Sequence, residues 1–326
     1  MSYTVTQESF SSLTSYWKNP ECNLKWDSVF VLPAWLEVWW REFEPRSELY
    51  LGVVRQQDDI IGIAPLQVTD GRAAFIGDTD VCDYMDFIVA PGREEELFAA
   101  VLDDLKKKGV SRLELEHVRP DSSVVTHLAE VAKGRGYAVD CRQAAVSFEM
   151  SLPPTWDEYL ERLEAKQRHE LRRKLRRISG AGQAAYRCVD GDGDPDALMA
   201  SFLKLFALSR EEKARFMNAR MEGFFRKLAM AMAGIGLLRF GVLEMNALPV
   251  AMIMGFDYND TVYLYNSAYD PAYTSLSVGL LSKAFGIRES IQSGRNKWDF
   301  LKGDEAYKRH IGGTEVPLYS CRITLG

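Results

Sequence analysis

The sequence predicts an α/β (α+β) protein built from two domains. Its 326 residues are long for one hydrophobic core and comfortable for two domains of about 150 residues each. Both halves also show the same order of elements, a strand meander followed by a helix and one more strand, although they share no run of identical residues. Each half is therefore expected to form one domain.

Alternating and helical patterns follow each other in the N-terminal half. The expected elements are a helix at 33–43, strands at 49–55, 60–68, 73–76 and 85–89, a helix at 93–108, a strand at 111–116, a helix at 121–135 and a strand or strand pair at 137–150. The stretch 151–155 contains two prolines and breaks both periods. We therefore expect the domains to be residues 1–152 and 153–326.

A long basic helix at 156–178 is expected to open the second domain. Thr155 is its expected N-cap, and its acidic residues come early and its basic ones late, as the helix dipole favours. Between Lys166 and Arg177 seven Lys or Arg residues face one acid, Glu170. Such a run is either a solvated helix face or a clamp for a phosphate-rich ligand, namely a coenzyme, RNA or anionic lipid. The residues leave both interpretations open.

The rest of the second domain is centred on a strand meander. Two helices, at 196–213 and 219–233, lead into strands expected at 237–244, 249–257 and 261–268. A helix ending at Gly294 comes next, and a strand at 298–301 and a polar loop at 302–313 complete the pattern.

The start of the helix that ends at Gly294 is a candidate anion site. Ser275 and Ser277 are candidate N-caps. Gly279 leaves the first turn without a side chain, so backbone N–H groups there are accessible to an anion. The junction between strand and helix is therefore a plausible site for a pyrophosphate group.

Composition excludes several classes of protein. The chain is 47% apolar and 26% charged with a net charge of −6, which is ordinary for a globular protein and argues against indiscriminate binding of polyanions. Its five cysteines are scattered, so neither a disulfide framework nor a zinc site is expected. No secretion signal or membrane-spanning run is found, and we expect a cytoplasmic protein. No motif typical of dinucleotide-binding, P-loop, serine-hydrolase or zinc-protease sites occurs.

Several stretches resemble one superfamily. They are PAWLEVWW, IIGIAPL, WDEYLERL with RHELRRKLRR, SLSVGLL, and KWDFLKGDEAYKRHIGG. With these stretches the chain resembles the GNAT acyltransferases, in the double-domain branch of the cellulose-biosynthesis-associated (CelD-type) acetyltransferases and the Fem-type aminoacyl transferases. The resemblance covers most of the chain. It implies two tandem GNAT-like domains, each a mixed twisted sheet flanked by helices.

The resemblance also implies a donor and a place for it. Acetyl-CoA or another acyl-CoA would lie in the C-terminal domain, between the strand ending near Ser267 and the helix opening near Ser277. The expected cofactor-binding residues are Ser267, Ser275, Ser277, Val278 and Gly279. The usual phosphate loop of the superfamily has two small residues and a leading Gln or Arg, whereas residues 273–279 keep one glycine. An aminoacyl-tRNA donor, as in the Fem-type branch, therefore stays open, and the basic helix suits either donor.

Acyl transfer to an amine needs a base, an oxyanion site and an acid. Lys308 is expected to stabilise developing charge, by resemblance to the aromatic-Lys pair of the Fem-type motif. Tyr307 is expected to protonate the thiolate, and Asp299 or Asp270 to take the amine proton. Backbone N–H groups near Ser267 are candidates for the oxyanion site. Both aspartates also have a structural interpretation. The Asp299 carboxylate could equally accept hydrogen bonds from the backbone at the end of its strand, and Asp270 could be a turn or cap residue.

Three functions remain open on the sequence alone. The first is an acyl-CoA-dependent N-acyltransferase for an amine such as an amino sugar or a polysaccharide or envelope precursor. The second is a Fem-type ligase that uses aminoacyl-tRNA, and the third is a catalytically inactive GNAT-like binding protein. The expected substrate-binding residues are Asp86, Tyr265, Asp270, Arg172 and Arg173, and no metal is expected.

Overall fold

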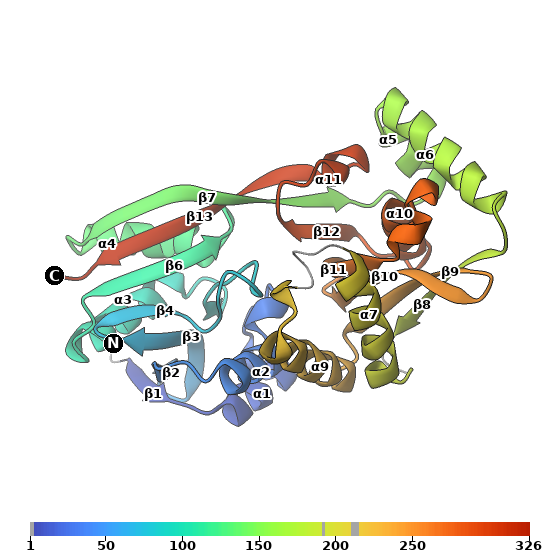
Figure 1. The fold of residues 1–326 in the computed structure, drawn as a ribbon. Coiled ribbons are helices and arrows are strands. Elements are labelled where there is room, and N and C mark those ends of the chain that lie inside the picture. Colours follow the sequence, from blue (N-terminus) through green and yellow to red (C-terminus); the bar gives the residue numbers. More distant parts are fainter. Residues whose placement is uncertain (1–2, 191–192, 210–214) are drawn as a thin grey trace. The chain divides into compact units, whose positions relative to one another are not determined.

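The chain forms two compact units. The computed structural model describes residues 3–190, 193–209 and 215–326, and Figure 1 shows the ribbon. Unit 1 comprises residues 1–146 and 316–326, and unit 2 comprises residues 147–315. The sequence placed the boundary at the prolines after residue 152, whereas the change of unit lies earlier, inside a long strand, and the C-terminal residues return to unit 1. Each unit is described by itself below.

Unit 1 is a mixed sheet with helices. Its elements are β1 (Thr4–Gln7), α1 (Phe10–Lys18), η1 (Pro20–Cys22), η2 (Val29–Val31), α2 (Pro33–Phe43), β2 (Glu48–Gln56), β3 (Asp59–Thr69), β4 (Arg72–Phe75), β5 (Ile88–Val89), α3 (Glu94–Lys107), β6 (Arg112–Val118), η3 (Val124–Leu128), α4 (Ala129–Gly134), and parts of β7 (Ala138–Ser151) and β13 (Thr314–Thr324). The strand order is β1-β2-β3-β4-β6-β13, and β5 pairs with β3. The pair β4–β6 is parallel, while the pairs β2–β3 and β3–β4 are antiparallel.

Unit 2 also combines mixed strands with helices. Besides its parts of β7 and β13, its elements are α5 (Trp156–Arg162), α6 (Ala165–Ser179), β8 (Ala184–Asp190), α7 (Pro195–Ser209), α9 (Ala219–Gly234), β9 (Leu238–Met245), β10 (Leu248–Tyr258), β11 (Thr261–Tyr269), η4 (Pro271–Leu276), α10 (Val278–Gln292), β12 (Lys297–Lys302) and α11 (Ala306–His310). The strand order is β7-β12-β11-β10-β9-β8. Within it β11 and β12 run parallel, whereas the other neighbours are antiparallel.

Tight turns and packed helices explain why the meander of unit 2 forms. Its two hairpin loops have positive φ at Asn246 and Ala247 and at Asn259 and Asp260, as two-residue hairpins that match strand twist require. Helices α7 and α9 cover one face of the sheet and α10 covers the other (Figure 1). Buried residues from both helix layers and the strands form the core. The predicted helix at 196–213 corresponds to α7, and its residues 210–213 lie outside the described residues.

The predicted single basic helix at 156–178 is wrong, because it is two helices. Thr155 caps α5 as expected, with its hydroxyl accepting the N–H of Glu158 at 3.2 Å. Leu163 then adopts an extended conformation (φ −70°, ψ 144°), and α6 begins at Ala165. Leu163 is 5% exposed, and its Cδ2 would lie 3.3 Å from a Cβ added at Gly312. The break between α5 and α6 therefore lies at a leucine that is buried beside the glycine loop after α11.

The scattered cysteines suggested no disulfide framework, but two of them pair. Cys141 of β7 and Cys321 of β13 form a disulfide across 180 positions of sequence. Scattered spacing gave no signal, because the sheet brings together two strands that are far apart in the chain. The cytoplasmic location stays a prediction. Within the part of the chain that the structure describes, no helix is both long and apolar enough to span a bilayer.

Candidate functional site

The two parallel strands of unit 2 define the candidate site. They pair only where residues 261–263 of β11 face residues 297–299 of β12, although β11 runs on to Tyr269 and β12 to Lys302. In sheets with parallel strands, ligands bind beyond the carboxyl ends of the strands. We call residues 264–283 and 300–310 of this region the carboxyl edge. The predicted cofactor residues and Tyr307 and Lys308 belong to it.

The first turn of α10 presents free backbone donors. Ser277 has a left-handed φ of 58°, and its carbonyl accepts the N–H groups of Leu280 and Leu281, each at 3.0 Å. The N–H groups of Val278 and Gly279 precede these and have no acceptor within the helix. Val278 is fully buried, whereas Gly279 is partly exposed, so of these two N–H groups the one on Gly279 is the more accessible to a ligand. Ser275 is exposed in η4.

Arg177 of α6 reaches this helix start, which sequence reasoning missed. Its Nη2 donates to the Ser277 hydroxyl at 3.0 Å. Its Nε is buried and has no hydrogen-bond partner among the described residues. The only signal in the sequence was that Arg177 ends the basic run of α6. The structure thus joins the two features that the sequence kept apart, the basic helix and the candidate pyrophosphate site.

Lys283 and Tyr307 form a buried pair next to the same turn. The Lys283 ammonium is 5% exposed, donates to the Gly279 carbonyl at 2.8 Å, and lies 4.9 Å from the centre of the Tyr307 ring. Burial, with a smaller contribution from the Glu305 carboxylate, raises the pKa of the Tyr307 phenol above its ordinary value. The phenol is therefore protonated throughout the neutral range. Sequence reasoning missed Lys283 because it lies on a helix whose stripe suggested core packing.

Lys308 is buried and fully engaged. It is 1% exposed, and its ammonium donates to three consecutive carbonyls, those of Leu301, Lys302 and Gly303, at 3.0, 2.6 and 3.1 Å. The Glu305 carboxylate lies 3.0 Å away. An ammonium has three N–H donors, so these carbonyls account for all of them. Lys308 therefore holds the turn that follows β12.

Asp299 acts on the same turn from the other side. It is 2% exposed, and its carboxylate accepts the N–H of Leu301 at 2.8 Å. Leu301 has a φ of 60°, and the pairing of β12 with β7 is interrupted by a bulge at this point. A left-handed conformation costs about 1–2 kcal/mol for a residue with a side chain. Asp299 and Lys308 together hold Leu301 in it, through its N–H and its carbonyl.

The backbone donors predicted near Ser267 are already occupied. The N–H of Ser267 donates to the Asn266 side chain at 2.9 Å. Two residues further on, the N–H of Tyr269 donates to the hydroxyl of Ser209, the last residue of α7, at 2.8 Å. A ligand that needs these two N–H groups must displace a side chain from each.

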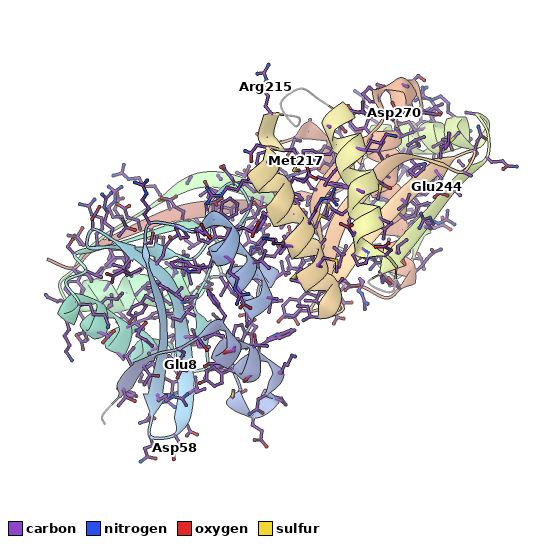
Figure 2. The ribbon with its side chains drawn as sticks, turned by 60° about the horizontal axis from the view of Figure 1, so that its bottom comes forward. Glu8, Asp58, Arg215, Met217, Glu244 and Asp270 are labelled. Atoms are coloured by element: carbon purple, nitrogen blue, oxygen red, sulfur yellow. A yellow bond between two sulfur atoms is a disulfide. The ribbon has the colours of Figure 1, made fainter. Side chains whose placement is uncertain are left out.

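The predicted substrate residues of unit 2 are spread over different faces. Asp270, on the loop after β11 (Figure 2), accepts the N–H of Ala272 at 2.9 Å and caps η4. Tyr265 packs on Phe225 of α9, with ring centres 5.5 Å apart. On α6, Arg172 is exposed, while Arg173 binds Glu170 with both groups exposed. Hydrogen bonds from Arg173 and Lys174 lower the pKa of Glu170 to about 2.

Asp86, the remaining predicted substrate residue, lies in unit 1. Its carboxylate accepts the N–H and the hydroxyl of Ser123, at 2.8 and 2.5 Å, and the N–H of Phe87 at 2.9 Å. These bonds tie it to the start of the helical segment that contains η3. Burial raises the pKa of Asp86 to about 6, against the opposite effect of these hydrogen bonds. A role for Asp86 in acceptor binding stays a prediction.

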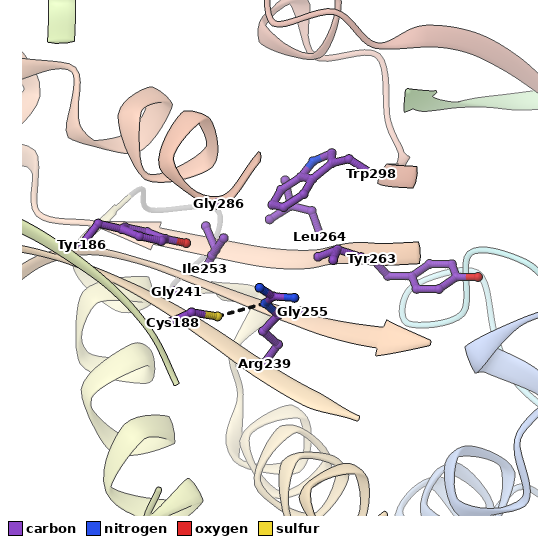
Figure 3. A pocket seen from close by; sticks show the side chains of 11 residues that line it. Tyr186, Cys188, Arg239, Gly241, Ile253, Gly255, Tyr263, Leu264, Gly286 and Trp298 are labelled. Carbon is purple, nitrogen blue, oxygen red and sulfur yellow. Dashed lines mark hydrogen bonds between the residues drawn. The ribbon is translucent and has the colours of Figure 1, made fainter. Parts of the chain in front are cut away.

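A small pocket elsewhere in unit 2 is not the candidate site. It lies between α10 and the strands β8 to β12, and Figure 3 shows its lining, including the hydrogen bond from Arg239 Nε to Cys188 Sγ at 2.9 Å. Its volume of about 10 Å³ has room for roughly one water molecule. Among the described residues, no three His, Cys, Asp or Glu side chains are grouped so that they could hold a metal ion.

A family model identifies this region. Residues 165–309 match the model described as acetyltransferase (GNAT) domain. The match begins at the first residue of α6 and ends in α11, so it includes the whole carboxyl edge except His310. Residues 165–309 therefore form an acetyltransferase domain of the GNAT type, as the sequence motifs in this part of the chain indicated. In the comparison with curated proteins, none matches the chain.

Solved structures share the fold at low identity. FemX has a TM-score of 0.67 at 11% identity, over 98% of this chain and 96% of that one. A protein of unknown function from Bacteroides thetaiotaomicron has a TM-score of 0.59 at 13% identity, and the match covers 99% of this chain and 100% of that one. A tandem GNAT protein from the clavulanic acid biosynthesis pathway has a TM-score of 0.54 at 13% identity, and the match covers 100% of this chain and 99% of that one. With the mixed sheets of both units, these similarities confirm the predicted tandem GNAT-like fold.

Proposed function

We propose that the chain is an acyl-CoA-dependent N-acyltransferase whose donor binds at the carboxyl edge of unit 2. The acyl group, acetyl in the simplest case, passes to an amine, such as an amino sugar or another polysaccharide or envelope precursor. One observation carries the proposal: the partly exposed N–H of Gly279, which has no acceptor in the helix, lies at the same helix start as the Arg177 guanidinium. No metal takes part in this proposal.

The helix start suits the diphosphate of CoA on electrostatic grounds. The N-terminus of α10 carries a partial positive charge and two N–H donors without acceptors in the helix. Arg177 adds a full positive charge with a planar set of donors that matches phosphate geometry. Among the described residues no carboxylate forms an ion pair with Arg177, so its charge is available to a ligand. Gly279 is partly exposed, and its missing side chain leaves room for the Tyr269 ring beside the helix start.

The reaction follows from the chemistry of a thioester. The amine nitrogen attacks the carbonyl carbon, a C–N bond forms, and the carbonyl π pair moves onto oxygen. That pair returns as the C–S bond breaks, the nitrogen loses a proton and the sulfur gains one. Tyr307 is the proposed acid, because its phenol carries a proton at neutral pH and its ring lies 4.9 Å from the Lys283 ammonium beside the first turn of α10. The amide and free CoA are the products.

Replacing Tyr307 with Phe should lower kcat about 100-fold and change the KM for acyl-CoA less than threefold, since only the acid is removed. Release of CoA thiol from acetyl-CoA, with a panel of amines as acceptors, measures both constants. Wild-type kcat should show no alkaline loss below about pH 10, because the phenol pKa lies above that value. Tyr137→Phe is the matched control, since Tyr137 also lies under a lysine, Lys106, but in unit 1. Equal kcat for all three proteins would remove Tyr307 from the mechanism.

A second candidate is a Fem-type transferase that takes its acyl group from aminoacyl-tRNA. The exposed face of α6 favours it, because Lys166, Arg172 and Arg176 are exposed and lack a carboxylate partner among the described residues. Likeness to FemX shows the fold alone and does not decide the donor. Phosphate backbones bind such cationic faces in a salt-dependent manner.

Charge reversal of Arg172, Arg173 and Arg176 to Glu should weaken tRNA binding at least 100-fold if this second candidate is correct. Filter binding at fixed salt measures it, with reversal of Lys106, Lys107 and Lys108 on and after α3 as the control. If α6 only forms a solvated face, both triple variants and the wild type bind tRNA with the same weak affinity.

A further inference from the structure

The turn after β12 directs two free N–H groups outward. The carbonyls of Lys302 and Gly303 point at the Lys308 ammonium. In a planar trans peptide the N–H points opposite to the carbonyl, so the N–H groups of Gly303 and Asp304 point away from the ammonium. Neither N–H has an acceptor among the residues that the structure describes. They are two adjacent donors at the carboxyl edge.

On the other side of the carboxyl edge, the two N–H groups of β11 nearest to the predicted site are already bound. The N–H groups of Ser267 and Tyr269 are bound by Asn266 and Ser209. Arg309 binds the carboxylate of Asp304, which reduces the negative charge next to the Gly303 and Asp304 donors. The free N–H groups after β12 are therefore better able to stabilise a developing negative charge than the N–H groups first predicted on β11.

We propose that the N–H groups of Gly303 and Asp304 bind the carbonyl oxygen of the acyl donor, and that Lys308 and Asp299 are positioning residues that hold the turn presenting them. The proposal rests on the acyl transfer proposed above and assigns its oxyanion site. When the carbonyl π pair moves onto oxygen, these donors stabilise the charge. Lys308 does not itself contact the oxygen, because its three N–H groups are taken by carbonyls.

Gly303 is required at this turn for two reasons. Its φ is 117°, which residues with a side chain rarely adopt. A Cβ at this position would also lie 2.5 Å from the Glu305 carboxylate and 3.2 Å from the Lys308 ammonium. Gly303→Ala therefore disturbs the same turn as Lys308→Met without removing a charge. If both residues act through the turn, their effects on kcat should not add.

Amide resonances of the wild-type protein test the oxyanion site directly. Acetyl-CoA and free CoA share their phosphates, but only acetyl-CoA has a thioester carbonyl. We expect the Gly279 amide to shift with both ligands, and the Gly303 and Asp304 amides to shift at least three times further with acetyl-CoA than with CoA. If Gly279 responds and the two other amides do not distinguish the ligands, the oxyanion site is wrong and the donor site stands. If no amide responds, both proposals are wrong.

Kinetics of the two variants test the positioning role. Lys308→Met and Gly303→Ala should each lower kcat about 100-fold and leave the KM for acetyl-CoA within threefold. The double variant should be no more than about threefold worse than either single variant. A double variant near the product of the two losses, about 10,000-fold, would mean that Lys308 contacts the reacting atoms. The wild-type resonances decide the proposal even where a variant does not fold.

Discussion

Replacing Gly279 with Asp should weaken the binding of acetyl-CoA about 100-fold relative to Gly279→Asn. Asp and Asn have nearly the same size, so their difference isolates the charge. A carboxylate about 4 Å from a phosphate charge is disfavoured by about 1 kcal/mol in water and about 4 kcal/mol at the effective dielectric of a protein surface. A hundredfold loss corresponds to about 2.7 kcal/mol, which lies within that range.

The Asp and Asn variants also control for packing and for helix stability. A Cβ at Gly279 would lie 3.1 Å from the Tyr269 ring, but both variants carry it. An acid in the first turn of α10 favours the helix dipole, so Asp should not unfold the helix. Titration calorimetry with acetyl-CoA measures the affinities. If the Asp and Asn variants bind equally well, the phosphates do not lie at the start of α10.

Replacing Lys308 with Met should lower the free energy of unfolding by about 3 kcal/mol. Methionine keeps the apolar length but leaves three carbonyls of the turn without their donor, and each buried unsatisfied group costs about 1–3 kcal/mol. The ion pair contributes little, because the Glu305 side chain is 56% exposed. Leu301 would also lose one of the two bonds that hold its left-handed conformation.

Urea unfolding measures this loss, and a second lysine of β12 gives the matched control. Lys297 forms one ion pair, with Glu149 at 3.4 Å, and its side chain is 38% exposed. Lys297→Met should therefore change the free energy of unfolding by less than about 0.5 kcal/mol. Glu305→Gln should have a similarly small effect. A loss for Lys308→Met no larger than that of Lys297→Met would show that the carbonyl bonds do not hold the turn.

Local patterns predicted much of unit 2. The strand-length apolar runs of the meander and the helical stripe after it indicated β9, β10, β11 and α10, because strands that helices cover on both faces read as continuous apolar runs. The candidate anion site was identified from two local features. Gly279 has no side chain, and the first N–H groups of any helix have no acceptor within the helix. These inferences use only residues close together in the chain.

Contacts between distant residues were beyond sequence reasoning. Arg177 and Ser277 are 100 positions apart, and no pattern in either segment indicates that they meet. The left-handed Leu301 has no local signal either, since Leu is among the residues that disfavour it. Lys308 was predicted from resemblance alone, and its burial among carbonyls depends on this backbone conformation. Sequence reasoning also missed strands β8 and β13. Whether these two segments form strands depends on the strands with which they pair, and these lie far away in the sequence.

The central claim is that the carboxyl edge of unit 2 binds the phosphates of an acyl-CoA. Titration calorimetry of the wild-type chain with acetyl-CoA and with free CoA tests it most directly, because the two ligands share those phosphates. We expect both to bind, with dissociation constants in the micromolar range and within about tenfold of each other. No detectable heat for either ligand up to millimolar concentration would contradict the claim, and binding of tRNA would then be the next measurement.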